Sequence, residues 1–267
     1  MIGKEHNNCR LRFQQALFVS NLDVCLNLAK QIVSGKVQNQ RTLVRRHSHE
    51  VIRREMHLEV MDLSLNQIKD AENIDKLRGI EGMAAKHYFG LYKHLVKKPR
   101  TGRWGFYDRN YYPPRDPVNA LLSFGYTLLL NEVTAACQKI GLDPYLGCFH
   151  AINYGRPSLS LDIMEEFRSV IVDSLVLDLV NHGRIQPDDF QIIKKETKHG
   201  SQKEGVFMSA AARNIYLAAF EGRINNFVIS NKSKKHLSYR HIIQAQTQQI
   251  SRIILANQEH YQPYIWR

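Results

Sequence analysis

The sequence predicts a mainly α-helical protein, and three observations lead to this fold class. Apolar residues recur at helical spacing through most of the 267 residues. Helix-capping residues and prolines flank several of these stretches. A convincing run of alternating polar and apolar residues, which would indicate a β-strand, is not found. With 43% hydrophobic residues the chain can bury a core in one large domain or two smaller ones. We expect about eight helices.

The first half of the chain contains three long helical stretches. Residues 13–33 are amphipathic and rich in helix formers, and residues 39–61 form a basic amphipathic stretch. A third helix is expected over residues 74–98. It ends where residues 98–117 begin, because a segment so rich in proline, glycine and aromatic residues cannot be helical throughout.

The second half begins with a helix over residues 118–141 that has clear signals at both ends. Asp116 is a fair N-cap, Pro117 suits the first turn and Gly141 suits the C-cap. A glycine-bearing loop, residues 141–157, leads into an apolar helix over residues 156–180. A polar linker follows at residues 194–205, and two amphipathic helices are expected over residues 207–228 and 239–258.

The charge of the chain favours a polyanionic partner. Lysine and arginine number 37 against 25 acidic residues, which gives a formal net charge of +12. We expect nucleic acid first and a membrane surface second, with a basic but indifferent surface as the alternative.

The cysteine pattern and the lack of long apolar runs point to the cytoplasm. The four cysteines form no CxxC pair, which is typical of free thiols in a reducing compartment. The first residues lack the apolar core of a signal peptide. No uncharged apolar run reaches the roughly 18 residues of a membrane span. We therefore expect a soluble, intracellular protein with no membrane partner.

The apolar stretch 156–180 carries an unusual set of acidic side chains. At helical spacing four carboxylates project within an arc of roughly 100°: Asp162, Glu165, Glu166 and Asp173. Neighbouring carboxylates repel one another unless a cation lies among them, so a metal site is one interpretation. The other is a solvated face, with Asp162 favouring the helix N-terminus and Arg168 pairing with a glutamate.

Glu81 and His150 are also unexpected in their surroundings. Glu81 shares a helical face with small and aromatic residues that should point inward, and a buried carboxylate needs a cation, a metal or a hydrogen-bond partner. His150 follows an apolar loop just before the acidic helix, where a histidine is usually a satisfied core residue. Together with Glu165 these residues would form a carboxylate–imidazole site, which suits Mg²⁺ or Mn²⁺ and leaves zinc or iron open.

Residues 86–115 combine basic and aromatic side chains. Eight lysines and arginines stand against one acid, and five aromatic residues lie among them: Trp104, Phe106, Tyr107, Tyr111 and Tyr112. The segment could contact phosphates and stack on unpaired bases, or it could be a connector whose aromatic residues pack into the core. A second basic stretch would reinforce a nucleic-acid surface: Arg41, Arg45, Arg46, Arg53 and Arg54.

Several motifs resemble those of the CRISPR-associated endonuclease and integrase family, Cas1. In order along the chain they are GIEGMAAKHYF, RDPVNALLSFGYTLL, LDPYLGCFH, RPSLSLDIMEEFRSVIVD and SYRHIIQAQTQQI. The resemblance covers most of the chain, from about Phe13 onward. It implies a mainly α-helical catalytic domain of the CRISPR integrase type, which inserts short foreign DNA segments into a CRISPR array.

The resemblance also implies roles for individual positions. Glu81, His150 and Glu165 match the family's catalytic residues, which bind a metal ion, and the implied cofactor is Mg²⁺ or Mn²⁺. Asp162, one turn before Glu165, would support the site or position DNA. Three neighbours are expected to be structural: Glu166, Arg168 and Asp173. Six basic residues are expected to contact DNA: Lys86, Arg100, Arg103, Arg109, Arg115 and Arg156.

The family usually begins with a β-rich domain that helps form a dimer and docks a small ferredoxin-like protein. We expect that domain to be absent or truncated here, with residues 1–12 as a remnant or linker and residues 13–267 as the catalytic domain. The implied partners are double-stranded DNA, a second copy of the chain and a Cas2-type ferredoxin-like protein, in a prokaryotic cytoplasm.

The expected reaction is a trans-esterification in which a DNA 3′-hydroxyl attacks a phosphodiester at the edge of a repeat. Attack by water at the same site would give nuclease activity. Two alternatives stay open: a catalytically incompetent DNA-binding relic or truncated form of the family, and a hydrolase of a small phosphorylated metabolite. Salt-sensitive DNA binding without metal-dependent strand transfer would identify the first, and duplex DNA as a competitor would test the second.

Overall fold

The computed structural model describes residues 8–47, 51–110, 112–196, 202–229, 236–255 and 260–266, with side chains undescribed at 51–54, 195–196 and 202–203. The predicted mainly α-helical fold is confirmed. The α-helices are α1 Cys9–Ser20, α2 Leu22–His47, α3 Val51–Lys69, α4 Ile74–Leu95, α5 Pro117–Ile140, α6 Ser158–Met164, α7 Ser174–Asn181, α8 Ala210–Asn225 and α9 Tyr239–Ile254.

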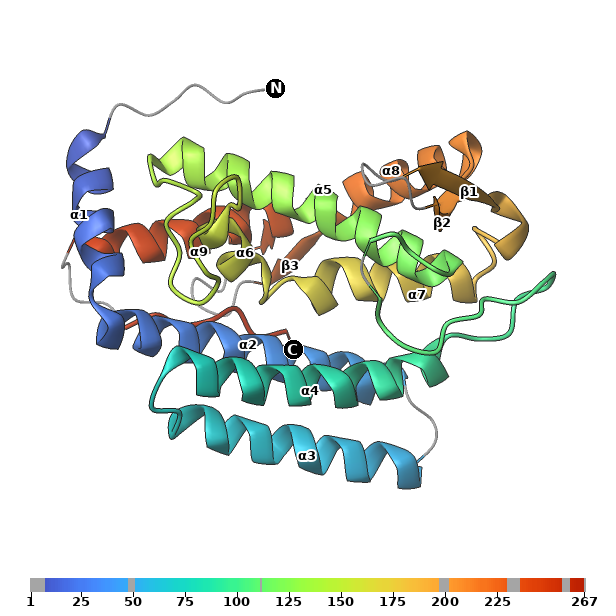
Figure 1. The fold of residues 1–267 in the computed structure, drawn as a ribbon, viewed down its shortest axis with the longest axis horizontal. Helices are drawn as coiled ribbons and strands as arrows, with labels where there is room; N and C mark the ends of the chain where they lie inside the picture. The colour runs from blue at the N-terminus through green and yellow to red at the C-terminus, as the bar shows by residue number, and fades with distance from the viewer. Residues whose placement is uncertain are drawn as a thin grey trace.

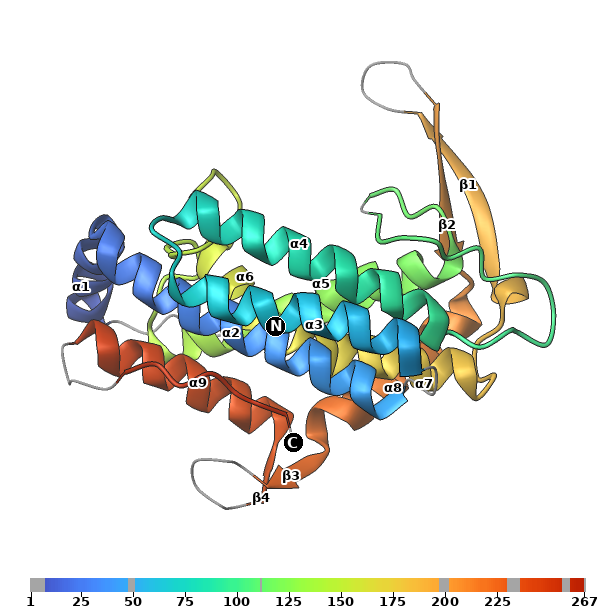
Figure 2. The same cartoon turned by 90° about the horizontal axis from the view of Figure 1, so that it is seen from below.

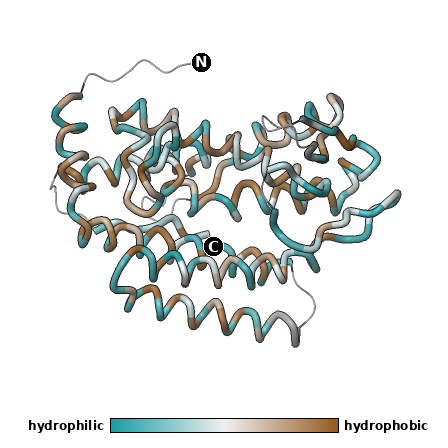
Figure 3. The backbone as a smooth tube through the Cα atoms, in the orientation of Figure 1, coloured by the Kyte–Doolittle hydropathy of each residue, from teal (hydrophilic) through white to brown (hydrophobic). Residues whose placement is uncertain are grey.

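The helices form two groups that face each other across the core (Figure 1). Helices α2, α3 and α4 pack together in one group, and α5 packs with α6, α9 and the segment before α7 in the other. Hydrophobic and hydrophilic residues alternate along the outer helix α3, as expected of a helix with one face in water (Figure 3). The segment from α6 to α7 lies between the groups, and the candidate site forms along it.

The α5 helix begins and ends where its sequence predicts. The Asp116 side chain accepts a hydrogen bond from the Asn119 backbone N–H, and Pro117 occupies the first turn. Gly141 closes the helix with a φ of 94°, a left-handed conformation that glycine adopts without a steric penalty. Of the described helices, α5 is the one long and apolar enough to cross a membrane by itself, with 44% of its apolar window buried. Helices α1 and α2 pass the same test only as a pair bent by 94°.

Two predicted helices are interrupted. Residues 13–33 do not form one helix, because the chain turns by 94° at Asn21, whose side chain accepts the backbone N–H groups of Asp23 and Val24 and starts α2. Residues 39–61 also do not form one helix, since α2 runs to His47 and α3 begins at Val51. Helix α1 begins at Cys9, and the predicted domain boundary between residues 12 and 13 stays a prediction.

The predicted helix over residues 156–180 is three pieces. Helix α6 is followed by the turn at residues 165–167, a π-helix Arg168–Asp173 and then α7. A π-helical turn holds an extra residue, so it rotates the face that later side chains present. Most of the segment is buried, including Asp162, Glu165, Glu166 and Asp173, so the interpretation of these carboxylates as a solvated face is wrong.

Glu166 shows how a buried carboxylate is accommodated here. It accepts hydrogen bonds from the Tyr264 backbone N–H at 2.7 Å, from Gln246 Nε2 at 3.1 Å and from the Tyr261 hydroxyl. Burial raises the pKa of Glu166 to about 7, and these hydrogen bonds offset part of that rise. Glu166 therefore joins the turn to α9 and to the last described residues of the chain.

Strands are present, which the sequence did not predict. Strands β1 Phe190–Glu196 and β2 Gln202–Met208 form an antiparallel hairpin, and β3 Phe227–Ile229 pairs with β4 His236–Ser238. The interpretation of residues 194–205 as a linker was therefore wrong. The β1–β2 hairpin projects from the helical body (Figure 2), and Ile192 is 70% exposed. Phe190 and Met208 pack against the core at the base of the hairpin, whereas residues 191–194 are exposed, so most of β1 needs no alternation of polar and apolar residues and its pattern gave no signal.

Asp173 ties the two helix groups together and sets a pH dependence of stability. It accepts hydrogen bonds from the hydroxyls of Tyr88 on α4 and Tyr126 on α5, each at 2.6 Å. Burial raises the pKa of Asp173 to about 6 from 3.8, and the two hydroxyls offset only part of that rise. Its stabilising contribution is therefore fully present below the unfolded pKa and is lost as the pH rises through about 6.

We expect Asp173→Asn to remove this dependence. Relative to the variant, the free energy of unfolding of the wild type should fall by about 3 kcal/mol between roughly pH 4 and pH 7. Urea unfolding of both proteins across this range measures the difference, in which the other titrating groups cancel. Parallel pH profiles for the two proteins would contradict the assignment.

Candidate active site

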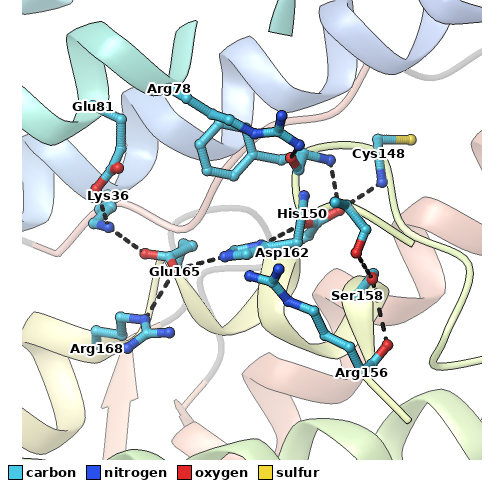
Figure 4. Close-up of polar contacts among 12 residues, drawn as sticks. Lys36, Arg78, Glu81, Cys148, His150, Arg156, Ser158, Asp162, Glu165 and Arg168 are labelled. Atoms are coloured by element: carbon cyan, nitrogen blue, oxygen red, sulfur yellow. Dashed lines mark hydrogen bonds and ion pairs between the residues drawn. The ribbon is translucent and has the colours of Figure 1, made fainter. Parts of the chain in front are cut away.

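The structure brings together the three residues predicted to be catalytic. Glu81 comes from α4, His150 from the loop before α6, and Glu165 from the turn after α6 (Figure 4). His150 Nε2 lies 3.7 Å from Glu165 Oε1. Glu81 and Glu165 meet through Lys36 of α2, whose Nζ lies 2.5 Å from Glu81 Oε1 and 2.5 Å from Glu165 Oε2. In the described part of the chain, no group of three acidic, histidine or cysteine side chains is placed to hold a metal ion.

Asp162 fixes the loop that carries His150. Its buried carboxylate accepts the backbone N–H groups of Cys148, Phe149 and His150 at 2.7, 3.0 and 2.9 Å. The same carboxylate lies 2.7 Å from Nδ1 of His150. Because a carboxylate accepts, Nδ1 must carry a proton, and in the neutral imidazole Nε2 then faces Glu165 with its lone pair. Asp162 thus orients the imidazole, and its role in supporting a metal site or positioning DNA stays a prediction.

Gly147 is required for the approach of this loop to α6. A Cβ at this position would lie 2.6 Å from the carbonyl carbon of Ser158, 2.7 Å from the backbone nitrogen of Leu159 and 2.7 Å from Asp162 Oδ2. Backbone atoms cannot move aside as a flexible side chain can, so the GxxH spacing needs glycine here.

We expect Gly147→Ala to cost about 1–3 kcal/mol of stability and to slow any reaction that uses His150. Gly79→Ala on α4 is a matched control, because a Cβ there would meet nothing within 4 Å. That control should be neutral or slightly stabilising. Thermal unfolding of both variants measures the effect, and equal melting temperatures would show that the loop tolerates the methyl group.

The charges of the site compensate one another. Burial raises the pKa of Glu165, but Arg168, Lys36 and His150 outweigh burial and hold it at about 2. Burial likewise lowers the pKa of Lys36, and Glu165 and Glu81 outweigh that effect, so its pKa lies above the usual value. Glu165 Oε2 has no aligned hydrogen bond, so its contact with Lys36 is an ion pair without good hydrogen-bond geometry. The Glu165 carboxylate and the Lys36 ammonium are therefore both charged at neutral pH.

A cavity of about 340 Å³ opens onto these residues. Lys36, Glu81, His150 and Glu165 line it. Three arginines line it as well: Arg109, Arg156 and Arg168. Arg168 Nε lies 3.0 Å from Glu165 Oε1, and its guanidinium stacks on Tyr126 with 4.6 Å to the ring centroid. The site thus combines a carboxylate pair, an imidazole and cations that could receive a phosphate.

The predicted DNA-binding residues divide into two sets. Arg109 and Arg156 line the cavity, and Arg109 is held by Asn119 at 2.8 Å and Ser123 at 3.1 Å. The others are exposed and lie outside it: Lys86, Arg100, Arg103 and Arg115.

The aromatic residues of this segment divide in the same way. Trp104 and Phe106 are buried, as the connector alternative predicts, whereas Tyr107 and Tyr112 are 82% and 76% exposed. Tyr111 lies outside the described residues, and so do the side chains of Arg53 and Arg54 in the second basic stretch.

Sequence reasoning missed Lys36 and undervalued Arg168. The predicted first helix ended at residue 33, which left Lys36 outside any helix, whereas α2 continues to His47. Its spacing was the available signal. Lys36 follows Ile32 by one helical turn, so the two side chains share a face, and Ile32 and the adjacent Val37 are both fully buried. Arg168 pairs with Glu165, as one interpretation of the sequence predicts, and it also lines the cavity, which its expected structural role did not include.

Comparison with known families decides the identity of the fold. The family model described as "CRISPR associated protein Cas1" matches residues 1–222, well over half of the chain. The chain belongs to the Cas1 family. The Cas1 match includes the segments that carry Glu81, His150 and Glu165.

Three relatives show the extent of the similarity. The CRISPR-associated endonuclease Cas1 3 of Thermus thermophilus is 37% identical over 242 residues, which are 91% of this chain and 67% of that protein. A solved Cas6-RT-Cas1–Cas2 complex matches with a TM-score of 0.83 and 26% identity, over 97% of this chain and 27% of that one. A casposase bound to an integration product matches with a TM-score of 0.81, over 98% of this chain and 69% of that one. At 21% identity the casposase shows the fold alone.

Proposed function

We propose that this Cas1-family chain carries the active site of a metal-dependent DNA endonuclease and integrase of CRISPR adaptation. The observation that carries the proposal is the convergence of Glu81, His150 and Glu165 at a cavity lined by arginines. The Thermus thermophilus relative, 37% identical, is named an endonuclease, and that name fits a site that breaks phosphodiesters.

The donor set fits Mg²⁺ or Mn²⁺. Glu81 and Glu165 converge on one cationic group, the Lys36 ammonium, and Asp162 leaves Nε2 of His150 as a lone-pair donor. Glu165 Oε2, buried and without an aligned hydrogen bond, is a further sign that this carboxylate has capacity for a ligand. When bound, the ion would supply Lewis-acid stabilisation of the charge that develops on the phosphoryl oxygens.

The chain's own residues would bind and orient the DNA. Arg109, Arg156 and Arg168 surround the cavity and would neutralise the phosphate under attack, while exposed basic residues of the 86–115 segment would contact the duplex further away. The 3′-hydroxyl oxygen of one strand forms a bond to phosphorus as the bond from phosphorus to the leaving 3′-oxygen of the target strand breaks. Asp162 would hold the imidazole in place throughout.

The partners follow from the same proposal. The formal net charge of +12 suits double-stranded DNA, both the foreign segment and the CRISPR repeat. A solved neighbour is a complex that contains Cas1 and Cas2, so we propose a ferredoxin-like Cas2-type protein and a second copy of this chain as protein partners. The Cas1 relatives are prokaryotic, and we propose the prokaryotic cytoplasm as the location.

A branched DNA tests the proposed chemistry with few components. Trans-esterification is reversible, so a duplex that mimics the integration product should be resolved by the site alone, without capture of two separate DNA molecules. We expect resolution with Mn²⁺ or Mg²⁺ and none with EDTA. Salt-sensitive binding of the duplex without resolution in either metal would support the DNA-binding relic instead. Hydrolysis of a small phosphoester that duplex DNA does not inhibit would support the metabolite hydrolase.

A further inference from the structure

Lys36 occupies an unusual place, because it lies inside the acidic cluster. Its ammonium contacts carboxylates from two different elements, Glu81 of α4 and Glu165 of the turn, at 2.5 Å each. The side chain is 11% exposed, and Glu165 is 4% exposed. This contact joins α2 and α4 to the turn that follows α6 (Figure 4). A lysine so placed is the cation that keeps two buried carboxylates together.

The charges of the four groups that contact one another here balance without any added ion. Lys36 and Arg168 carry two positive charges, and Glu81 and Glu165 carry two negative ones. A divalent cation entering between the two carboxylates would meet the ammonium at the point where they converge. The ion and Lys36 Nζ cannot both contact Glu81 Oε1 and Glu165 Oε2, so an ion that takes these two oxygens displaces the lysine.

The cavity beside Lys36 leaves room for its side chain to move. Its side chain lines the 340 Å³ cavity together with Arg109, Arg156 and Arg168. A lysine has a flexible four-carbon stem, so its head can move by several ångströms without a change in the backbone. In the cavity the ammonium would face the position proposed for the DNA phosphate.

We propose that Lys36 is a built-in counter-ion that competes with the divalent cation for Glu81 and Glu165. The competition lowers metal affinity and holds the carboxylates in place while no metal is bound. Once displaced, the ammonium is available to the substrate phosphate. This inference rests on the proposed function, since it requires that Glu81 and Glu165 bind a metal ion.

Binding of Mn²⁺ alone tests the competition without DNA and without activity. Isothermal titration calorimetry on the full chain would compare the wild type with Lys36→Met, which keeps the length of the side chain and removes its charge. We expect the dissociation constant for Mn²⁺ to fall about tenfold or more, because the competing cation is gone. We also expect Lys36→Met to have a lower melting temperature than the wild type without metal and a larger rise on adding Mn²⁺.

Two further variants make the result decisive. Lys30→Met is the matched control on α2, where Lys30 Nζ contacts only the Lys69 carbonyl oxygen among the interactions described for it, and should leave Mn²⁺ affinity unchanged. Lys36→Gln keeps a hydrogen-bond donor, so it provides a foldable variant if Lys36→Met does not fold, with the same direction of effect.

The outcomes separate this inference from the proposed function. If the wild type binds Mn²⁺ through Glu81 and Glu165 but neither Lys36 variant binds it more tightly, the competition is refuted and the proposed function stands. If Glu81→Gln and Glu165→Gln leave Mn²⁺ binding unchanged, or neither the wild type nor a Lys36 variant binds Mn²⁺, both the metal site and the competition are refuted.

Discussion

Glu81→Gln should lower the rate of metal-dependent strand transfer by about 10³-fold while the protein stays folded. Glutamine has the same size but no negative charge, so it loses its attraction for the metal ion. Glu81 is the more exposed of the two carboxylates, at 19% against 4% for Glu165, so its replacement should disturb the core less. The rate is measured on the branched DNA with saturating Mn²⁺.

The control for this variant lies on the same helix. Asp75→Asn removes a carboxylate in the first turn of α4 that pairs with Arg78 and is 90% exposed. An exposed pair contributes little, so the control should keep nearly wild-type activity and stability. Strand transfer by Glu81→Gln at more than a tenth of the wild-type rate would show that Glu81 is not a metal ligand.

Asp162→Ala should destabilise the protein by about 3–5 kcal/mol, the largest stability effect expected for an acidic residue of the site. The substitution leaves three backbone N–H groups and the Nδ1–H of His150 without their acceptor in a buried setting. It also frees the loop that presents His150, so strand transfer should fall with the stability. Urea unfolding measures the first effect.

A surface carboxylate provides the comparison for Asp162. Asp178 on α7 is 39% exposed and contacts His182 and Arg184. We expect Asp178→Ala to change stability by no more than about 0.5 kcal/mol. If both alanine variants unfolded at the same urea concentration, Asp162 would not be the anchor of the loop.

The sequence predicted the helical class and the convergence of Glu81, His150 and Glu165. It did not predict the contacts that surround each of these side chains. Family motifs locate these three positions even though 84 residues separate Glu81 from Glu165. The same motifs do not show what surrounds each side chain. Asp162 was placed beside the site, but its four interactions with one loop depend on the path of the backbone.

Other features depended on tertiary contacts that local pattern does not encode. Lys36 reaches the site only because α2 continues past residue 33 and packs beside α4. Glu166 and Asp173 were expected to be structural, but the sequence did not show that tyrosine hydroxyls from distant elements would satisfy them in the core. In the β1–β2 hairpin, residues 191–194 of β1 are exposed, so they have no buried face that would have produced alternation.

The most direct test of the metal site is anomalous diffraction from crystals soaked in Mn²⁺. The account predicts a peak about 2.0–2.3 Å from a carboxylate oxygen of Glu81, a carboxylate oxygen of Glu165 and Nε2 of His150. Lys36 Nζ should then have left its position between the carboxylates. A peak at other residues, or Lys36 still bridging Glu81 and Glu165 at saturating Mn²⁺, would contradict it.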